Sequence, residues 1–333
     1  MLAQWKRFLA DKVKTPRQTS YPNTYEVIGA RGKAEGRPEV FEPALKHFGS
    51  AFRLGDPQFP DAASQRAWQE AGLQVAHHLV HMLMNSPWQE HLVLRGSFLL
   101  KTWFGDAARN PHDIDWVFRP SEANMDGALG QQLVLDLIHM AQHRPHVGSA
   151  VIQADDIRVD DIWTYERASG RRIVFPWQAD DLPRGQVQMD IVFGEPLFDD
   201  PVQTRIASPN RDDCVVWTAS KELSLAWKLL WLQTDWYPRP KDLYDAALLA
   251  ENSELSGALL YRVFKANSDA SLDEITPDFA FVAGRDWDDF QLEYTSLPGT
   301  TEEWQARLAT ALAPLFQPGP RALSKRQTVS AEQ

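Results

Sequence analysis

Two aspartates separated by one residue, Asp113 and Asp115, are the side chains of this sequence best suited to chemistry. They belong to the segment His112-Asp113-Ile114-Asp115-Trp116, whose alternation is typical of a β-strand. Alternate side chains of a strand face the same side, so both carboxylates face one way and Ile114 faces the other. Two like charges this close repel each other unless a cation or a proton lies between them. We therefore predict that the pair holds Mg²⁺ or Mn²⁺.

A third acid, Asp190, stands alone in the otherwise apolar strand pattern of residues 187–193. With a third carboxylate, a site can bridge two ions about 3.5–4 Å apart, which clamps the attacking and leaving oxygens in phosphoryl chemistry. We predict Asp190 as the third metal ligand. Two alternatives stay open at this stage. Asp113 and Asp115 could be exposed acids on an edge strand, and Asp190 could be an ordinary acid at a strand end.

Gly96 and Ser97, upstream of the acids, form the other half of the predicted site. A glycine lets the backbone approach a phosphate closely, and the N-terminus of a following helix presents free N–H groups. The pair therefore predicts a cradle for the phosphates of a nucleoside triphosphate (NTP). The alternative is that Gly96 marks an ordinary strand-to-helix turn.

Short elements must bring these residues together. Apolar periodicity predicts helices over 61–85 and 98–104, strands over 91–95 and 113–118, and a helix from a Ser121 cap to Gln142. Alternation then predicts strands at 157–159, 162–165, 173–175 and 187–193, with a hairpin turn at 168–171. The expected fold class is α+β, with a mixed or antiparallel sheet.

The sequence after residue 200 reads as mainly helical. Ser220 is expected to cap one helix, Pro240 to open the next, and Thr300 to Glu303 to form a capping box. We predict four parts: an N-terminal arm over 1–60, an α+β core over 61–205, a helical domain over 206–317 and a disordered tail over 318–333.

Composition limits the classes of function. The formal net charge is −11, so an RNA-binding role would need a local basic patch. The single cysteine, Cys214, excludes an internal disulfide and fits a reducing compartment. No apolar run is long enough for a membrane helix, and charge follows the first residues too soon for a signal peptide. We expect a soluble, cytoplasmic protein.

Other residues invite functional interpretations that we set aside. His77 and His81 lie one helical turn apart, but no third metal ligand is apparent. We expect Cys214 to be a buried core residue. Trp103, Trp116 and Trp177 are expected in the core, with base stacking as the alternative. Basic residues near the two termini could touch RNA, although solvated charge is the simpler interpretation.

Three blocks of the sequence resemble the AbiEii/AbiGii toxin family, within the nucleotidyltransferases of the DNA polymerase β superfamily. The first runs from Arg95-Gly96-Ser97 through the two aspartates, with Arg95 where the family often has glycine. The second is Lys221 to Leu229, and the third is Arg239 to Asp245. The resemblance covers roughly residues 90 to 250. It implies a polymerase-β-like nucleotidyltransferase domain followed by a helical C-terminal domain that completes the active site.

The resemblance also implies roles for single residues. Asp113 and Asp115 would hold the metal ions with Asp190 as third ligand, and the glycine–serine turn would cradle the β- and γ-phosphates. Lys228 would neutralise the triphosphate, and Asp242 would position that lysine or the acceptor. Each has a simpler alternative, because Lys228 could extend from an amphipathic helix into solvent and Asp242 could be a first-turn acid. We interpret Asp245 as structural.

The implied function is a metal-dependent nucleotidyltransferase that moves NMP from an NTP to an acceptor hydroxyl, with RNA, particularly tRNA, as an acceptor. The resemblance further implies a toxin of a toxin–antitoxin or phage-defence system, with a cognate antitoxin as partner. Two rival hypotheses are a catalytically silent binding protein that keeps the fold, and a two-metal phosphohydrolase or nuclease.

Overall fold

The structure is a computed structural model of the whole chain, and it describes residues 22–26, 37–45, 51–162, 168–208, 212–235, 237–267, 284–295 and 297–316. The chain divides into two compact units. Unit 1 comprises Met1–Ser220 with Leu292–Thr295, and unit 2 comprises Lys221–Gln291 with Ser296–Gln333. The expected terminal basic contacts and C-terminal tail lie outside the described residues, as does most of the strand expected at 162–165.

A mixed sheet forms the centre of unit 1. Its strands are β3 (Leu92–Arg95), β4 (Asp113–Phe118), β5 (His146–Val147), β6 (Ala150–Ile152), β7 (Arg158–Asp161), β8 (Ser169–Ala179), β9 (Gly185–Phe193), β10 (Val202–Ile206) and β11 (Cys214–Thr218). The order is β10-β11-β3-β4-β9-β8-β6-β5, with β7 also paired to β8. β4 runs parallel to β9 and antiparallel to β3. The α+β fold class with a mixed sheet is therefore confirmed.

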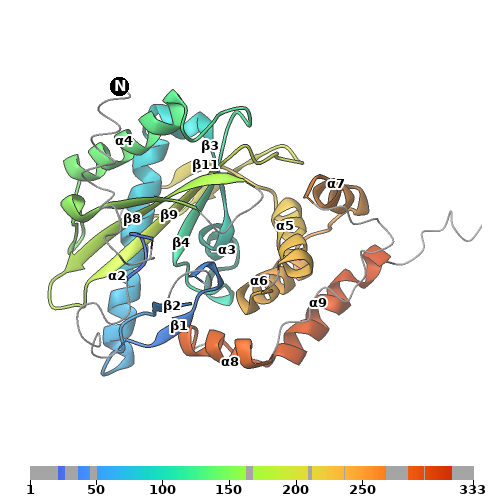
Figure 1. Cartoon of the computed structure of the whole chain (residues 1–333). Helices are drawn as coiled ribbons and strands as arrows, with labels where there is room; N and C mark the ends of the chain where they lie inside the picture. Colours follow the sequence, from blue (N-terminus) through green and yellow to red (C-terminus); the bar gives the residue numbers. More distant parts are fainter. Residues whose placement is uncertain are drawn as a thin grey trace, which may run out of the picture. The chain divides into compact units, whose positions relative to one another are not determined.

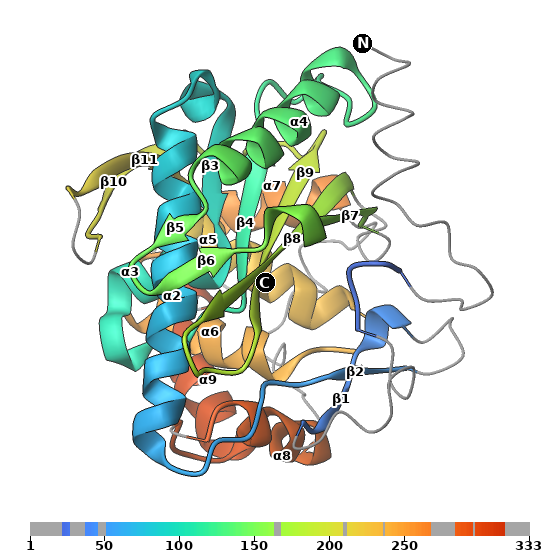
Figure 2. The same cartoon turned by 90° about the vertical axis from the view of Figure 1, so that its left-hand side faces the viewer.

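Two helices, α2 (Ala62–Met84) and α4 (Ala128–His143), cover one face of this sheet (Figures 1 and 2). Asp61 caps α2 by accepting hydrogen bonds from the N–H groups of Ala63 and Ser64. The apolar stripes of both helices join one core with the inward side chains of the strands. From β4 the core takes Ile114, Trp116 and Phe118, so Asp113 and Asp115 lie on the opposite face of the sheet.

The smaller elements of unit 1 complete its chain path. An antiparallel pair, β1 (Glu39–Phe41) and β2 (Phe52–Leu54), precedes α2. The helix α3 (Gly96–Phe104) follows β3 directly. Single 3-10 turns lie at η1 (Pro43–Leu45), η2 (Pro87–His91), η3 (Gly105–Ala107) and η4 (Ala154–Asp156).

Two local expectations for unit 1 were wrong. The helix expected from Ser121 begins at Ala128, because Asn124 first forms a turn whose side chain and carbonyl accept the N–H groups of Asp126 and Gly127. Residues 169–171, expected in a hairpin turn, are the start of β8, because that strand pairs with β9 from Ser169 onwards. The pairing along the two strands outweighs the turn preference of serine and glycine.

The division into units also differs from the expected boundary at residue 205. β10 and β11 form an antiparallel pair, and β11 joins the sheet beside β3. These backbone hydrogen bonds keep the chain in unit 1 up to Ser220.

All the regular elements described in unit 2 are helices. It contains α5 (Lys221–Thr234), α6 (Pro240–Glu251), α7 (Gly257–Asn267), α8 (Gly284–Glu293, of which the last residues belong to unit 1) and α9 (Thr301–Phe316). Pro240 is the first residue of α6, as expected. The expected capping box is confirmed, because the Thr300 N–H donates to Glu303 and the Glu303 N–H donates to the Thr300 hydroxyl. Among the helices described, none is long and apolar enough to span a membrane.

Candidate active site

The turn between β3 and α3 brings its backbone directly against an acid of β4. Gly96 has φ +79°, a conformation that side-chain-bearing residues rarely adopt. A Cβ placed on Gly96 would lie 2.0 Å from Asp115 Oδ2. Glycine is therefore required here for two reasons, the backbone conformation and the close approach to a carboxylate.

Asp113 joins the same turn through Ser97. The Ser97 hydroxyl donates a hydrogen bond of 3.0 Å to Asp113 Oδ1. Ser97 is buried, whereas the two aspartates are partly exposed. The structure thus brings together the four residues of the first predicted block, with the N-terminus of α3 beside two carboxylates on one face of β4.

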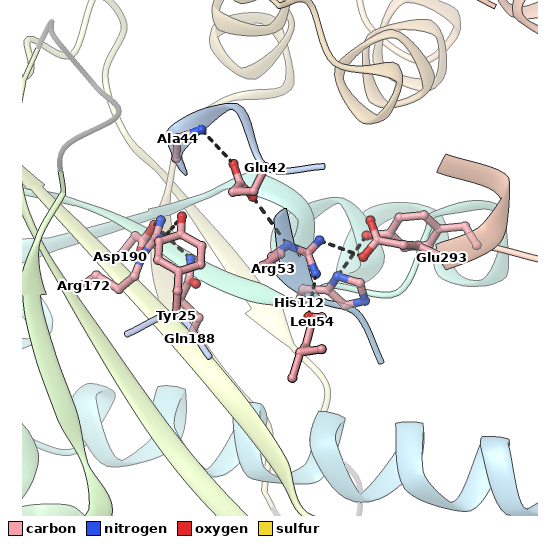
Figure 3. Close-up of polar contacts among 11 residues, drawn as sticks. Tyr25, Glu42, Ala44, Arg53, Leu54, His112, Arg172, Gln188, Asp190 and Glu293 are labelled. Atoms are coloured by element: carbon pink, nitrogen blue, oxygen red, sulfur yellow. Dashed lines mark hydrogen bonds and ion pairs between the residues drawn. The ribbon is translucent and has the colours of Figure 1, made fainter. Parts of the chain in front are cut away.

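Asp190 lies next to this group but faces a cation of the protein. In the parallel pairing of β4 with β9 its Cα is the partner of Asp115. Its carboxylate accepts hydrogen bonds from Arg172 Nε at 3.0 Å, from Arg172 Nη2 at 2.8 Å and from Gln188 Nε2 at 3.1 Å (Figure 3). Asp190 and Arg172 are both buried. Asp190, which we predicted as the third metal ligand, therefore has both carboxylate oxygens bound to Arg172.

The three aspartates differ in their fit to a divalent cation. Asp113 and Asp115 fit, since hard divalent cations prefer carboxylate oxygens and both acids are partly open to solvent. Asp190 does not fit in this arrangement, because its two oxygens are engaged by Arg172 and Gln188. Within the part of the chain that the structure describes, no group of three or more His, Cys, Asp or Glu is placed to hold a metal ion.

A buried lysine joins α5 to α6 within unit 2. Lys228 Nζ lies 2.7 Å from Asp242 Oδ1 and 2.9 Å from Asp245 Oδ2. The two aspartates are three residues apart, so they share one face of α6. All three side chains are buried. The contact between Lys228 and Asp242 is the one expected of an acid that positions the lysine, and Asp245, which we interpreted as structural, makes the same kind of contact.

A polar network surrounds the residue that precedes Asp113. His112 Nε2 lies 3.3 Å from Asp56 Oδ2 and its ring stacks on Tyr294. Burial by itself lowers the pKa of His112, but the charge of Asp56 and the hydrogen bond to it outweigh burial, so that the pKa is raised. The Tyr294 hydroxyl accepts a hydrogen bond from the buried Arg109. Burial raises the pKa of Tyr294, which keeps this phenol neutral.

Arg53 of β2 ties the network to a second segment of unit 1. Its Nη2 donates to Glu293 Oε1 at 2.7 Å, and its Nε lies 3.5 Å from Glu42 Oε2 (Figure 3). The network therefore fixes the loop between α3 and β4 against segments before and after the sheet. It supplies rigidity to the backbone that carries Asp113.

Two residues near the predicted chemistry were missed by the sequence interpretation. Arg172 pairs with Asp190, and Tyr25 accepts a hydrogen bond from Arg172. The only sequence signal for Arg172 was a pair of arginines at 171 and 172 inside an apolar strand. Such a pair calls for acidic partners, because buried arginines are costly unless paired.

Several of the residues that we set aside lie in the core, and Trp103 packs against it while partly exposed. Trp116 and Trp177 are fully buried in the core, and Cys214 is buried as expected. Burial lowers the pKa of His77 to about 4, so its ring is neutral near pH 7. Arg95, which stands where the resembled family often has glycine, donates a hydrogen bond of 2.7 Å to Glu195.

Comparison with known proteins identifies the family. The family described as nucleotidyl transferase AbiEii toxin, type IV toxin–antitoxin system, matches residues 78–326. No curated protein matches the chain. Among solved structures, a candidate nucleotidyltransferase of H. pylori is similar, with TM-score 0.45 and 14% identity over 78% of this chain and 96% of that one. MenT4, a nucleotidyltransferase toxin of Mycobacterium tuberculosis H37Rv, is similar with TM-score 0.43 and 15% identity over 78% of this chain and 100% of that one. Because the family match spans well over half of the sequence, the chain belongs to the AbiEii nucleotidyltransferase toxins of type IV toxin–antitoxin systems.

Proposed function

We propose that this protein transfers NMP from an NTP to an acceptor hydroxyl, with a divalent cation held at Asp113 and Asp115. The observation that carries the proposal is the contact between the turn and the acids. Gly96 lies against Asp115, and Ser97 donates a hydrogen bond to Asp113. Triphosphate chemistry needs a turn that can bind phosphate beside carboxylates that can bind a metal ion, and the contacts of Gly96 and Ser97 with the two aspartates support both roles at one place.

The β3–α3 turn supports binding of the phosphates. The first N–H groups of a helix have no partner within the helix, and they attract anions together with the helix dipole. Gly96 adds no side chain that would keep a phosphate away from this backbone. Ser97 orients the Asp113 carboxylate through its hydroxyl. The turn would hold the β- and γ-phosphates while the acids face the reacting part of the substrate.

The reaction follows from this placement. The acceptor oxygen attacks the α-phosphorus in line, a new P–O bond forms, the bond to the bridging oxygen of the β-phosphate breaks, and pyrophosphate leaves. The acceptor hydroxyl gives its proton to solvent water in the same step. A divalent cation, when bound, neutralises charge on the phosphate oxygens. The residues of the chain contribute mainly by orienting the two substrates and by holding the carboxylates rigidly.

The roles of Lys228 and Asp242 stay proposals that rest on the family. Lys228 would neutralise the triphosphate, and Asp242 would position Lys228. The contact of 2.7 Å between them supports the positioning role. Lys228 also contacts Asp245. With two carboxylates beside one ammonium group, the three side chains together carry no net positive charge.

The acceptor class that we propose is RNA, particularly tRNA, with a cognate antitoxin opposing the activity. Membership of a type IV toxin family supports the toxin role and the existence of an antitoxin. The net charge of −11 requires that contacts with RNA be local.

The direct test incubates the protein with each labelled NTP, Mg²⁺ and total RNA, and follows label in RNA, in protein and in free nucleotide. Asp113→Asn and Asp115→Asn should each reduce transfer by about 100-fold or more, because charge stabilisation at the phosphates is lost. Asp181→Asn, an exposed acid in the β8–β9 turn, is the matched control and should transfer normally.

Other outcomes would replace the proposal. Release of phosphate or nucleotide without transfer would indicate a phosphohydrolase or nuclease. An absence of NTP binding together with an absence of transfer would indicate a catalytically silent binding protein. Label in protein instead of RNA would keep the reaction and change the acceptor.

A further inference from the structure

A row of charged side chains crosses four neighbouring strands beside the candidate site. Asp115 on β4 is in register with Asp190 on β9, Asp190 with Arg172 on β8, and Arg172 with Asp160 on β7. Paired residues of neighbouring strands project from the same face of a sheet. The order along the row is therefore acid, acid, arginine, acid. Arg172 has a carboxylate on either side, and the partner that it takes decides whether Asp190 has its oxygens available.

Arg172 takes Asp190. The guanidinium binds that carboxylate through two parallel hydrogen bonds of 3.0 and 2.8 Å. A fork of this kind is strong and holds the acid in one orientation. Asp190 and Arg172 are 3% and 8% exposed, so little water weakens the pair. A cation that recruited Asp190 would have to displace a buried arginine and leave its charge without that partner.

The N-terminal segment 22–26 keeps Arg172 in this position. Its Tyr25 hydroxyl accepts a hydrogen bond from Arg172 Nη1, and the guanidinium carbon lies 5.1 Å from the centre of the Tyr25 ring (Figure 3). The same segment binds the competing acid, since the Thr24 N–H donates to Asp160 at 2.6 Å and Asn23 donates to it at 3.3 Å. Because Asp160 already accepts hydrogen bonds from this segment, Asp190 is the carboxylate that Arg172 binds.

We infer that Arg172 withholds Asp190 from the catalytic cation, so that Asp113 and Asp115 bind the cation without a third carboxylate from β9. Arg172 and Tyr25 are then positioning residues that set the number of protein ligands at the cation. The inference rests on the proposed function only in placing the cation at Asp113 and Asp115. It departs from the expectation, drawn from the sequence, that Asp190 completes a triangle of ligands.

The test measures Mn²⁺ binding to the full chain by titration calorimetry and by the Mn²⁺ electron paramagnetic resonance signal, without NTP. Asp115→Asn should weaken binding by about tenfold or more, because a ligand is lost. Asp190→Asn should keep the Mn²⁺ dissociation constant within about threefold of the unmodified protein, because its oxygens already bind Arg172. Equal weakening in Asp190→Asn and Asp115→Asn would overturn the inference.

Releasing Asp190 gives the sharper result. Arg172→Gln should tighten Mn²⁺ binding by about threefold or more, because a carboxylate becomes available beside Asp115. The double variant Arg172→Gln with Asp190→Asn should return to the original affinity, which assigns the gain to Asp190 rather than to the changed net charge. Unchanged affinity in a folded Arg172→Gln variant, or a gain that survives in the double variant, would overturn the inference.

Two further variants separate this role from general effects. Arg184→Gln removes an exposed arginine next to β9 that binds Asp156 instead of Asp190 or segment 22–26, and it should leave Mn²⁺ affinity unchanged. Tyr25→Phe keeps the ring and removes only the hydroxyl, so it should shift affinity in the direction of Arg172→Gln by a smaller factor. Circular dichroism verifies folding. A protein that binds no Mn²⁺ at all would overturn the cation site itself, whereas failure of the proposed reaction would appear only in the labelled NTP assay.

Discussion

Gly96 combines a backbone constraint with a chemical one, and a single methyl group can test both. Gly96→Ala must adopt a positive φ and must also move the Asp115 carboxylate, which lies 2.0 Å from the added Cβ. Gly105 also has a positive φ, but a Cβ there meets nothing within 4 Å. The two glycines therefore form a matched pair in which only one approaches the acids.

We expect Gly105→Ala to lower the free energy of unfolding by about 1–3 kcal/mol, the cost of a backbone conformation that residues with a Cβ rarely adopt. Gly96→Ala should lose that amount and about 1–3 kcal/mol more from the forced displacement of Asp115. Urea denaturation of both variants provides the measurement. Equal losses of unfolding free energy in the two variants would show that Asp115 moves aside at no cost. The closeness of Gly96 to Asp115 would then have no effect on stability.

His77 of α2 provides a prediction about pH. Its ring lies 4.9 Å from that of Phe98, and burial lowers its pKa to about 4. An unfolded histidine has a pKa near 6.5, so below that pH the unfolded chain binds a proton that the folded protein refuses. His77 therefore lowers the free energy of unfolding progressively as the pH falls from about 6.5 to about 4. Below pH 4 it causes no further change.

We expect His77→Gln to flatten this part of the dependence of unfolding free energy on pH. His139→Gln, on the exposed side of α4, is the control and should leave the slope as it is. Denaturation at intervals between pH 4 and pH 7 makes the comparison. An identical slope in both variants would mean that His77 is protonated in the folded protein.

At the level of elements, α5 and α6 are joined by one buried cation between two buried anions. Lys228→Met keeps much of the apolar stem but leaves Asp242 and Asp245 without their partner. Such a loss typically costs about 3–5 kcal/mol. We expect a decrease of that size in the free energy of unfolding, measured by urea denaturation.

Controls separate this effect from a catalytic one. Lys265→Met, on the exposed side of α7, should change stability by less than about 0.5 kcal/mol. Adding Asp242→Asn and Asp245→Asn to Lys228→Met should recover stability without recovering transfer. If Lys228→Met were as stable as the unmodified protein, its loss of activity could be assigned to the triphosphate alone.

Elements with a strong local pattern could be predicted from the sequence. The strand of Asp113 was predicted with both ends correct, because alternation of acids with buried residues is a local signal. The long helix was predicted to within one residue at each end, since Asp61 is a good cap. The contact of the glycine–serine turn with the acids follows from two neighbouring strands joined by one short helix.

The partners of Asp190 and Lys228 could not be predicted in the same way. The pair of Arg172 with Asp190 depends on the register of β8 against β9, and a shift by one residue would turn Arg172 to the other face. The contact of Tyr25 with Arg172 depends on a segment 147 residues away. Asp245 lies on the same face of α6 as Asp242, but a spacing of three does not show which face meets the lysine.

At the level of the whole molecule, net charge gives a test of the acceptor. A chain of net charge −11 is repelled by RNA as a whole, so transfer to RNA must depend on a few local contacts with phosphates. Each such contact releases counterions. We expect labelling of RNA to fall by about tenfold or more between 50 and 200 mM salt, which corresponds to roughly two or more phosphate contacts.

The same titration with a small hydroxylated acceptor is the control, and its rate should change much less. Initial rates with subsaturating RNA give the measurement. A rate on RNA that is insensitive to salt would contradict an RNA acceptor and would favour a protein or a small molecule.

The attachment of Tyr25 to Arg172 also sets an order of events during synthesis. The two residues are 147 positions apart. At about 5–20 residues per second, the ribosome adds Arg172 roughly 7–30 s after Tyr25. For most of that interval, until Arg158 and Asp160 are added, segment 22–26 has no native partner on β7 or β8. A newly made chain therefore completes its row of charges late, with residues 22–26 packing against strands that did not yet exist when those residues were made.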